Sequence, residues 1–175
     1  MSETTEAVYA FLDGLGIDYR RDIHGPTASM EDCAGVDRHL GTLTPKNIFL
    51  APKNGRAYYL CITRPAALFR TSDISRQAGS ARLSYAPEEK MIELLRARGG
   101  SASPLGLIFD RDHRVKLLVD SALTKEPTLG FHPCDNTETV VMAQSDFFSK
   151  FLPAVGVCPQ FVEIHHFMNP VGPKA

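Results

Sequence analysis

Two short apolar runs separated by an Asn-Gly turn constrain the fold of this chain more than any other feature. Residues 47–51 and 57–63 are rich in apolar and aromatic side chains, and Lys53-Asn54-Gly55 lies between them. Asn-Gly between such runs favours a β-hairpin because both residues tolerate the positive φ that tight hairpin turns require. The sequence therefore predicts a sheet that contains at least one antiparallel strand pair.

The remaining hydrophobic pattern predicts further strands and several helices. Strands are expected at residues 17–23, at 105–109 and 115–119 around Arg111-Asp112, at 129–132 and 137–142, and at an edge position over 160–164. Helices are expected at residues 3–15, 30–36 (capped by Ser29), 73–78, 87–98 and 145–152 (capped by Ser145). Hairpins outnumber βαβ units, so we expect an α+β (mixed α/β) fold whose central sheet is mixed but mainly antiparallel and is surrounded by helices.

Chain length and composition are those of a single globular domain. The 175 residues are 43% hydrophobic and 22% charged, with no repeat, low-complexity tract or linker. We expect a domain over residues 1–165 and a tail over 166–175, and the adjacent His165-His166 pair at their boundary is a weak candidate for ligand binding. The acidic N-terminus lacks the pattern of a secretory signal, and no run of about 18 apolar residues is present. These features predict a cytoplasmic protein without a membrane partner.

The four cysteines do not predict a metal site. Cys33, Cys61, Cys134 and Cys158 form no Cys-x-x-Cys pair and have no histidine at metal-ligand spacing. A structural zinc site requires clustered thiolates or imidazoles within tetrahedral reach. We expect reduced cysteines at buried or half-buried positions, no metal and no cofactor.

Positive charge is concentrated in the middle of the chain. Residues 38–98 carry an excess of seven positive charges, although the whole chain has a net charge of -1. A basic region on an otherwise acidic protein is compatible with a phosphate-binding face. It is equally compatible with a solvated surface whose cations point in several directions.

Three polar segments are candidates for chemistry. Lys46-Asn47 directly precedes an apolar strand, so the lysine lies at a sheet rim and is either a phosphate-binding group or an ordinary surface lysine. The loop Gly100-Ser101-Ala102-Ser103-Pro104 offers backbone amides to an oxyanion or is a simple connecting turn. His132, Asp135 and Asn136 lie between two strands, where they either orient a substrate or brace the turn.

The order of these segments resembles one protein family. Lys46-Asn47 before a strand, the Gly100-x-x-x-Pro104 loop and the run Gly-Phe-His-Pro-x-Asp-Asn-Thr at 130–137 follow one another as in the YbaK/ProX family of aminoacyl-tRNA editing domains. The segments Leu-Ser-Tyr-Ala-Pro-Glu-Glu at 83–89 and Ser-Pro-Leu-Gly-Leu at 103–107 are similar to those of the prolyl-tRNA-synthetase-associated branch. The resemblance extends from about His24 into the last predicted strand.

The resemblance implies a function and a set of site residues. It implies hydrolysis, without a metal, of the ester in mischarged tRNA(Pro), above all Ala-tRNA(Pro), with prolyl-tRNA synthetase as a further partner and no DNA. Water attacks the ester, assisted by the 2′-OH of the terminal ribose, so no protein nucleophile is needed. The implied catalytic residues are Lys46, Gly100, Ser101, Ala102, Ser103 and Pro104, and the implied substrate-binding residues are His24, Asn47, His132, Asp135 and Asn136.

Alternatives to this function remain at the sequence level. One is a deacylase of the same fold that acts on Cys-tRNA(Pro) or on another misacylated tRNA. A second is a non-catalytic tRNA-binding or synthetase-associated module, and a third is a hydrolase that uses Cys134 as its nucleophile, for which no base partner is evident. The chain also departs from the family pattern at three places. Cys134 stands where relatives more often have Asn, and Phe109-Asp110 replaces a more usual Asn-Asp pair. Residues 23–26 match the pattern only in part.

Overall fold

The computed structural model describes residues 2–26 and 38–165. Its strands are β1 (Tyr19–Ile23), β2 (Lys46–Pro52), β3 (Tyr58–Thr63), β4 (Leu83–Tyr85), β5 (Val115–Asp120), β6 (Thr128–Phe131), β7 (Glu138–Ala143) and β8 (Gln160–Val162). Its helical elements are α1 (Glu3–Gly14), α3 (Thr71–Gln77), α4 (Glu88–Leu95), η1 (Pro104–Phe109), η2 (Ser121–Lys125), α5 (Gln144–Asp146), η3 (Phe147–Phe151) and α6 (Leu152–Ala154).

A five-stranded mixed sheet has the strand order β4-β2-β3-β5-β8. The predicted hairpin is confirmed, since β2 and β3 pair antiparallel from Lys46–Thr63 to Leu50–Tyr59, and Gly55 in its turn has a φ of 62°. Strand β4 adds antiparallel to the outer edge of β2, whereas β5 joins β3 in parallel and β8 joins β5 in parallel. This sheet supplies the parallel pairs of a mixed α/β fold.

A second sheet contains three antiparallel strands in the order β1-β7-β6. The segment before β2 links it to the larger sheet through a bridge between Leu43 and Leu129, where the Gly130 amide donates to the Leu43 carbonyl at 2.9 Å. The predicted mixed fold with antiparallel strand pairs is confirmed, but the strands divide between two sheets instead of forming one central sheet.

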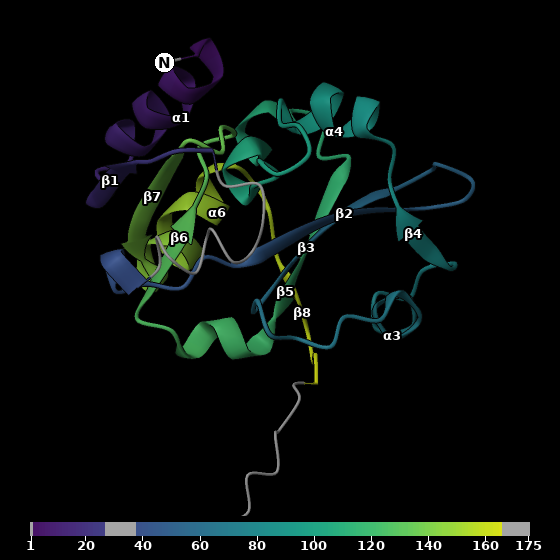
Figure 1. Cartoon of the computed structure of the whole chain (residues 1–175). Helices are drawn as coiled ribbons and strands as arrows, with labels where there is room; N and C mark the ends of the chain where they lie inside the picture. Colours follow the sequence, from purple (N-terminus) through teal and green to yellow (C-terminus); the bar gives the residue numbers. More distant parts are fainter. Residues whose placement is uncertain (1, 27–37, 166–175) are drawn as a thin grey trace, which may run out of the picture.

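Helices cover the two sheets and enclose two hydrophobic clusters. In Figure 1, α1 lies beside the three-stranded sheet, α4 lies above the five-stranded sheet, and α3 lies below β4. The larger cluster joins alternate residues of β2, β3 and β5 to α1, α4 and the helical segment 144–154. The smaller cluster lies on the opposite face of the larger sheet, against α3 and β8. Both faces of β2 and β3 are therefore buried, which explains their continuous apolar sequences.

The predicted strand at residues 105–109 is wrong. Residues 104–109 form the 3₁₀ helix η1, with Pro104 at its first position and the Ser103 hydroxyl accepting a hydrogen bond from the Leu105 amide at 3.2 Å. Proline fixes a helical φ and lacks the amide that a strand would pair, so Ser-Pro starts a helix here. The predicted strand over 115–119 is confirmed, but it pairs in parallel with β3 rather than across a turn at Arg111-Asp112.

Two helix ends differ from the prediction. The helix expected over 87–98 ends at Leu95, because Arg96 adopts the left-handed conformation with a φ of 51°. The helix expected to start from a Ser145 cap begins at Gln144 instead, with Ala143 in the capping position and no side-chain cap. The predicted helices near residues 3–15 and 73–78, and the edge strand near 160–164, are confirmed.

Some expectations fall outside the described residues. The helix expected at 30–36, its Ser29 cap, Cys33 and the tail over 166–175 belong to this group. Among the helices within 2–26 and 38–165, none is long and apolar enough to cross a membrane.

Candidate active site

The glycine–proline loop at residues 99–104 connects α4 to η1 and is held by its own side chains. The Gly99 amide donates to Glu88 Oε1 at 2.7 Å, which ties the loop to the first turn of α4. The Ser101 hydroxyl donates to the Arg98 carbonyl and accepts from the Arg98 amide. Ser101 and the capping Ser103 are both buried, and their hydroxyls form hydrogen bonds within the loop. These side chains therefore stabilise its conformation.

An open pocket of about 500 Å³ lies against this loop. Gly100 and Ala102 line it from the loop, and Asn47 lines it from the start of β2. The amides of Gly100 and Ala102 donate to no acceptor within the described part of the chain. Backbone amides with no internal partner beside a pocket are suited to bind a carbonyl oxygen or an oxyanion. The pocket walls are mostly apolar, formed by Ile48, Phe49, Tyr85, Ala86 and Met91 with Glu88.

Asn47 brings a hydrogen-bond acceptor to the same pocket. Its Nδ2 donates to the Pro45 carbonyl at 3.2 Å, whereas its Oδ1 is buried and accepts no hydrogen bond within residues 2–26 and 38–165. A buried polar atom without a partner is rare in folded proteins and often marks a functional position. Because Oδ1 is shielded from solvent, it reaches a ligand in the pocket only when the Asn47 side chain rotates.

A second, more polar pocket of about 360 Å³ also borders the loop. Ser101 lines it together with Asp135 and Asn136 from the turn between β6 and β7, and Gly99 lines both pockets. Asp135 Oδ1 accepts from the Thr137 hydroxyl at 2.6 Å and from the Thr137 amide at 2.9 Å. These two hydrogen bonds hold the pKa of the Asp135 carboxyl below its usual range, so it is charged at neutral pH.

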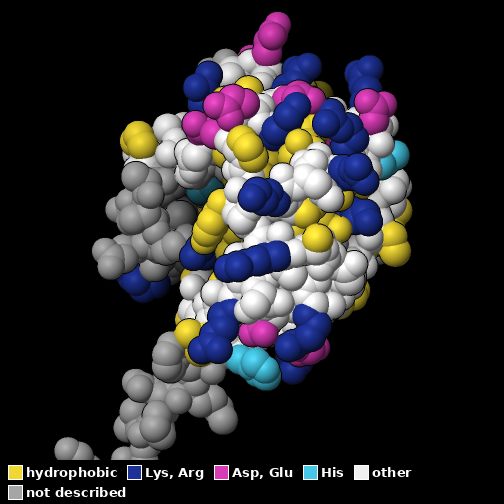
Figure 2. All heavy atoms as spheres, turned by 90° about the vertical axis from the view of Figure 1, so that its right-hand side faces the viewer, with side chains coloured by type: hydrophobic (Ala, Val, Ile, Leu, Met, Phe, Trp, Pro, Cys, Tyr) yellow, Lys and Arg dark blue, Asp and Glu magenta, His cyan; other side chains and the backbone are white. Residues whose placement is uncertain are grey.

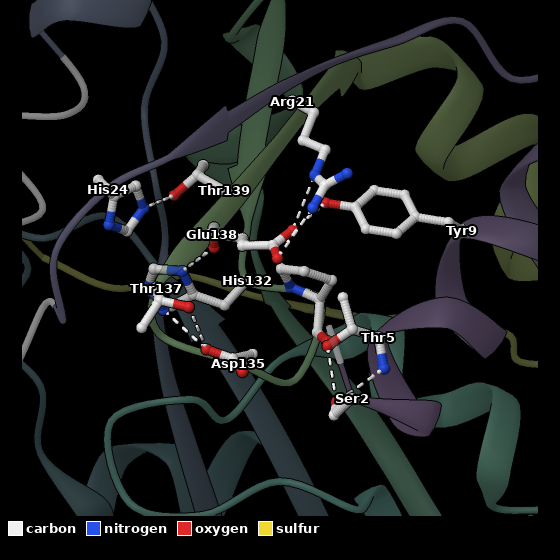
Figure 3. Close-up of polar contacts among 11 residues, drawn as sticks. Ser2, Thr5, Tyr9, Arg21, His24, His132, Asp135, Thr137, Glu138 and Thr139 are labelled. Atoms are coloured by element: carbon white, nitrogen blue, oxygen red, sulfur yellow. Dashed lines mark hydrogen bonds and ion pairs between the residues drawn. The ribbon is translucent and has the colours of Figure 1, made fainter.

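Two histidines lie close together beyond this turn (Figure 3). Their ring centroids are 6.0 Å apart. His132 is only 4% exposed, and its Nδ1 lies 2.8 Å from the Glu138 carbonyl. His24 Nδ1 lies 2.7 Å from the Gly25 carbonyl, and its Nε2 lies 2.9 Å from the Thr139 hydroxyl. Since a carbonyl only accepts, neutral His24 carries its proton on Nδ1 and accepts from Thr139 at Nε2.

Lys46 is the half-buried first residue of β2 and pairs with Thr63. It lines neither of the two pockets, and neither does His132. The chain just before Lys46 passes close to β6, since a Cβ added at Gly130 would lie 2.7 Å from Thr44 Oγ1. The structure thus brings Asn47 together with Gly100 and Ala102, and brings Ser101 together with Asp135 and Asn136, around a single loop.

The sequence of this site region matches a known family. The aminoacyl-tRNA editing domain matches residues 24–149, which is well over half of the chain. The chain belongs to the aminoacyl-tRNA editing domain family. This match confirms the resemblance indicated by the three motifs, all of which lie within the matched range.

Individual relatives match most of this chain. The chain is 29% identical to the prolyl-tRNA editing protein ProX of Acetoanaerobium sticklandii, over 93% of this chain and 98% of the relative. It is 31% identical to prolyl-tRNA synthetase associated domain-containing protein 1 of Danio rerio, over 81% of this chain and 77% of the relative. A solved structure described as a candidate trans-editing enzyme for prolyl tRNA synthetase superposes with a TM-score of 0.71, at 15% identity, over 95% of this chain and 99% of that one.

This editing domain also contains a buried polar cluster that the sequence did not indicate. Glu138 is 7% exposed, forms an ion pair with Arg21 at 2.9 Å, and accepts from the Tyr9 hydroxyl at 2.8 Å (Figure 3). Burial and the hydrogen bond to Glu138 raise the pKa of Tyr9, so its phenol keeps its proton. The cluster fastens α1 and β1 to β7 behind His132. The sequence feature that could have pointed to this cluster is the glutamate within the apolar run of β7.

The contacts of Cys134 in the editing domain indicate a structural role. It has a φ of 61°, and its thiol donates to the Leu95 carbonyl across 3.5 Å. Burial raises the pKa of this thiol to about 12, so the nucleophilic thiolate is scarce at neutral pH. No group of three or more His, Cys, Asp or Glu side chains in the described residues is arranged to hold a metal ion.

Proposed function

We propose that this chain is a trans-editing aminoacyl-tRNA deacylase that hydrolyses the ester of mischarged tRNA(Pro), with Ala-tRNA(Pro) as its preferred substrate. The observation that supports it most is the pocket beside the glycine–proline loop, where Gly100 and Ala102 offer amides and Asn47 offers an acceptor. Membership of the editing family and the names of the relatives, a prolyl-tRNA editing protein and a prolyl-tRNA synthetase associated protein, support the choice of tRNA(Pro).

The proposed chemistry uses the loop as an oxyanion site. The ester carbonyl oxygen accepts from the amides of Gly100 and Ala102, which stabilise the negative charge that develops when water adds to the carbonyl carbon. Collapse of the tetrahedral intermediate breaks the bond to the ribose oxygen, which leaves with a proton as a hydroxyl, and releases the free amino acid. The neighbouring ribose 2′-OH assists the attacking water. After rotation of its side chain, Asn47 Oδ1 accepts from a ribose hydroxyl or from the α-ammonium group of the amino acid.

The remaining residues take supporting roles in this proposal. Lys46 binds the terminal adenosine or its phosphate, and Pro104 together with Ser101 and Ser103 holds the loop in the conformation that exposes its amides. His24, His132, Asp135 and Asn136 shape the far side of the substrate site. The editing domain in this proposal spans residues 1–165, because α1 docks onto the β6–β7 turn through the Thr5 hydroxyl and the Pro133 carbonyl.

The proposed preference for alanine rests on the size of the amino-acid side chain that the pocket accepts. A difference of one methylene changes binding in a pocket by about 1–3 kcal/mol, so discrimination between alanine, serine and cysteine depends on a few wall residues. A deacylase specific for Cys-tRNA(Pro) is therefore the nearest competing proposal. A non-catalytic tRNA-binding module is the more distant one.

The test is deacylation of tRNA(Pro) charged separately with alanine, serine, cysteine or proline. We expect the purified protein to release alanine fastest and to leave Pro-tRNA(Pro) intact. Lys46→Ala is expected to reduce the rate ~100-fold or more, the scale of losing one electrostatic contact in an active site. Asn47→Ala is expected to reduce it as well, since it removes the acceptor in the pocket.

Lys150→Ala is the matched control for Lys46→Ala. It also removes one positive charge, but from the helical segment 144–154, where Lys150 pairs with Asp146 on the surface. If no charged tRNA is deacylated above the buffer rate, the enzyme proposal fails. Faster release of cysteine than of alanine would replace the proposed substrate with Cys-tRNA(Pro).

A further inference from the structure

Strand β4 is an outer edge strand with an exposed aromatic side chain, and the proposed chemistry does not use it. Tyr85, its last residue, is 69% exposed. Ordinary folding does not require a large aromatic ring in solvent at a sheet edge. Tyr85 and Ala86 nevertheless line the pocket that contains Asn47 and Gly100, so the ring stands at the entrance to the proposed site.

The other end of β4 is positively charged. Pro52 pairs with Leu83 in the antiparallel β2–β4 ladder, so Lys53 and Arg82 follow at the next position on the two strands. Both side chains are exposed, and Arg56 is exposed in the same hairpin turn. Three exposed cations therefore lie around this end of the sheet edge.

Helix α3 adds more positive charge beside this strand end. The Leu83 amide donates to Ser75 Oγ at 2.8 Å, which fastens α3 to β4. Arg70 and Arg76 come from this helix region, and Arg76 pairs with Asp73 at 3.3 Å. Within the described part of the chain, no carboxylate forms an ion pair with Lys53, Arg56, Arg70 or Arg82.

These cations share one face of the molecule. Figure 1 draws β4, α3 and the β2–β3 hairpin on the right-hand side, and Figure 2 views the molecule from that side. Dark blue Lys and Arg side chains extend over this face, with the magenta acidic side chains mostly near its upper and lower margins. A strand rises about 3.3 Å per residue, so only about 10 Å of β4 separates the cations from the pocket entrance.

We propose that the β4 edge binds the acceptor end of the tRNA, an inference that rests on the proposed function. Tyr85 stacks on a base of the unpaired 3′ end beside the pocket, and Lys53, Arg56 and Arg82 contact phosphates of the adjoining backbone. Single-stranded nucleic acid is bound in this manner by an aromatic platform next to a positively charged groove.

The test measures binding and catalysis separately on the same variants. The binding readout is the Kd for uncharged tRNA(Pro), measured by fluorescence anisotropy over a range of salt concentrations. The catalytic readout is KM and kcat for deacylation of Ala-tRNA(Pro). The variants are Tyr85→Ala, Tyr85→Phe and the double variant Lys53→Ala/Arg82→Ala, with Lys150→Ala as the charge control.

The double variant is expected to raise Kd and KM ~10-fold and to leave kcat unchanged. Its plot of log Kd against log salt should be less steep by about 1.4, because each lost phosphate contact removes about 0.7 from the slope for a single strand. Tyr85→Ala should raise Kd and KM between ~5-fold and ~100-fold, as expected for the loss of one stacked base. Tyr85→Phe keeps the ring and should behave as the unchanged protein.

Two results would overturn the inference. The first is a double variant whose Kd and salt slope equal those of Lys150→Ala, although the unchanged protein deacylates Ala-tRNA(Pro). This result would leave the proposed function intact. The other is a Tyr85→Ala variant that binds as tightly as Tyr85→Phe. If the unchanged protein binds tRNA(Pro) through these residues but deacylates nothing, the proposed function fails and the binding surface stands.

Discussion

The residues around the glycine–proline loop divide into those that hold the backbone and those that present groups to the pocket. Ser101 and Ser103 use their hydroxyls to close the loop, whereas Gly100 and Ala102 have amides with no internal acceptor. Cys134 belongs to the first group, since its thiol donates to the end of α4 from a left-handed backbone position. In the proposed mechanism, the loop's backbone amides bind the substrate and its side chains hold the loop in place.

Replacement of Cys134 tests that division. Cys134→Ala removes the thiol and should leave the rate of Ala-tRNA(Pro) deacylation within ~3-fold, because the buried thiol has a pKa of about 12 and no base beside it. A modest loss of stability, ~1–2 kcal/mol, is expected from the lost packing and hydrogen bond. The checks are the deacylation rate and urea denaturation. Loss of activity in a folded Cys134→Ala variant, with activity retained in Lys46→Ala, would reverse the site assignment.

Among the elements, the junction between α4 and η1 determines where the loop lies. Gly106 is buried in η1, and a Cβ added there would lie 2.5 Å from the Leu95 carbonyl and 3.0 Å from the Leu95 Cβ. This close approach packs η1 against the end of α4 and so fixes the distance between the two ends of the loop that joins them. The sequence indicated a strand over 105–109 because Leu-Gly-Leu-Ile-Phe is apolar, and a short buried run does not distinguish a strand from a helical turn.

Gly106→Ala is expected to destabilise the protein by about 1–3 kcal/mol, since the added methyl group meets backbone that must move. The displaced loop should also lower the deacylation rate. Urea denaturation and a deacylation assay at a temperature where the variant is folded measure the two effects. Gly14→Ala is the control, because a Cβ there meets nothing within 4 Å. Equal stability of the two variants would show that the α4–η1 contact has no such role.

Across the whole molecule, burial also changes the pKa of an ionisable group that the proposed chemistry does not use. Cys61 is fully buried in β3, and burial, with the Asp120 carboxylate nearby, raises the pKa of its thiol from 9.0 to about 12. In the unfolded chain the thiol ionises at its ordinary value. A group whose pKa is higher in the folded state contributes stability that is complete below the unfolded pKa and is lost as the pH rises toward the folded one.

The free energy of unfolding should therefore decrease between about pH 9 and pH 12. Cys61→Ala should lower stability at pH 7 through the cavity it leaves, yet should show a shallower decrease above pH 9 than the unchanged protein. Urea denaturation at pH 7, 9 and 10 measures both quantities. Cys158→Ala, at an exposed position, should keep the original pH dependence. A pH dependence that is identical in all three proteins would contradict this account.

The sequence by itself determined the local elements and the family of this editing domain. The hairpin at Asn54-Gly55, helix α1 and the β6–β7 pair follow from hydrophobic periodicity and turn residues, which act between near neighbours. The order of Lys46-Asn47, the Gly100–Pro104 loop and the motif at His132 was sufficient to identify the family.

Only the tertiary structure decided how these segments meet. The division of the strands into two sheets, the parallel pairing of β5 with β3 and the left-handed turn at Arg96 depend on packing between residues far apart in the chain. The same packing places Asn47 beside Gly100 and Asp135 beside Ser101, and brings Tyr85 of β4 to the pocket. Sequence periodicity reports which face of an element is buried, whereas the partner that covers it is chosen by the whole fold.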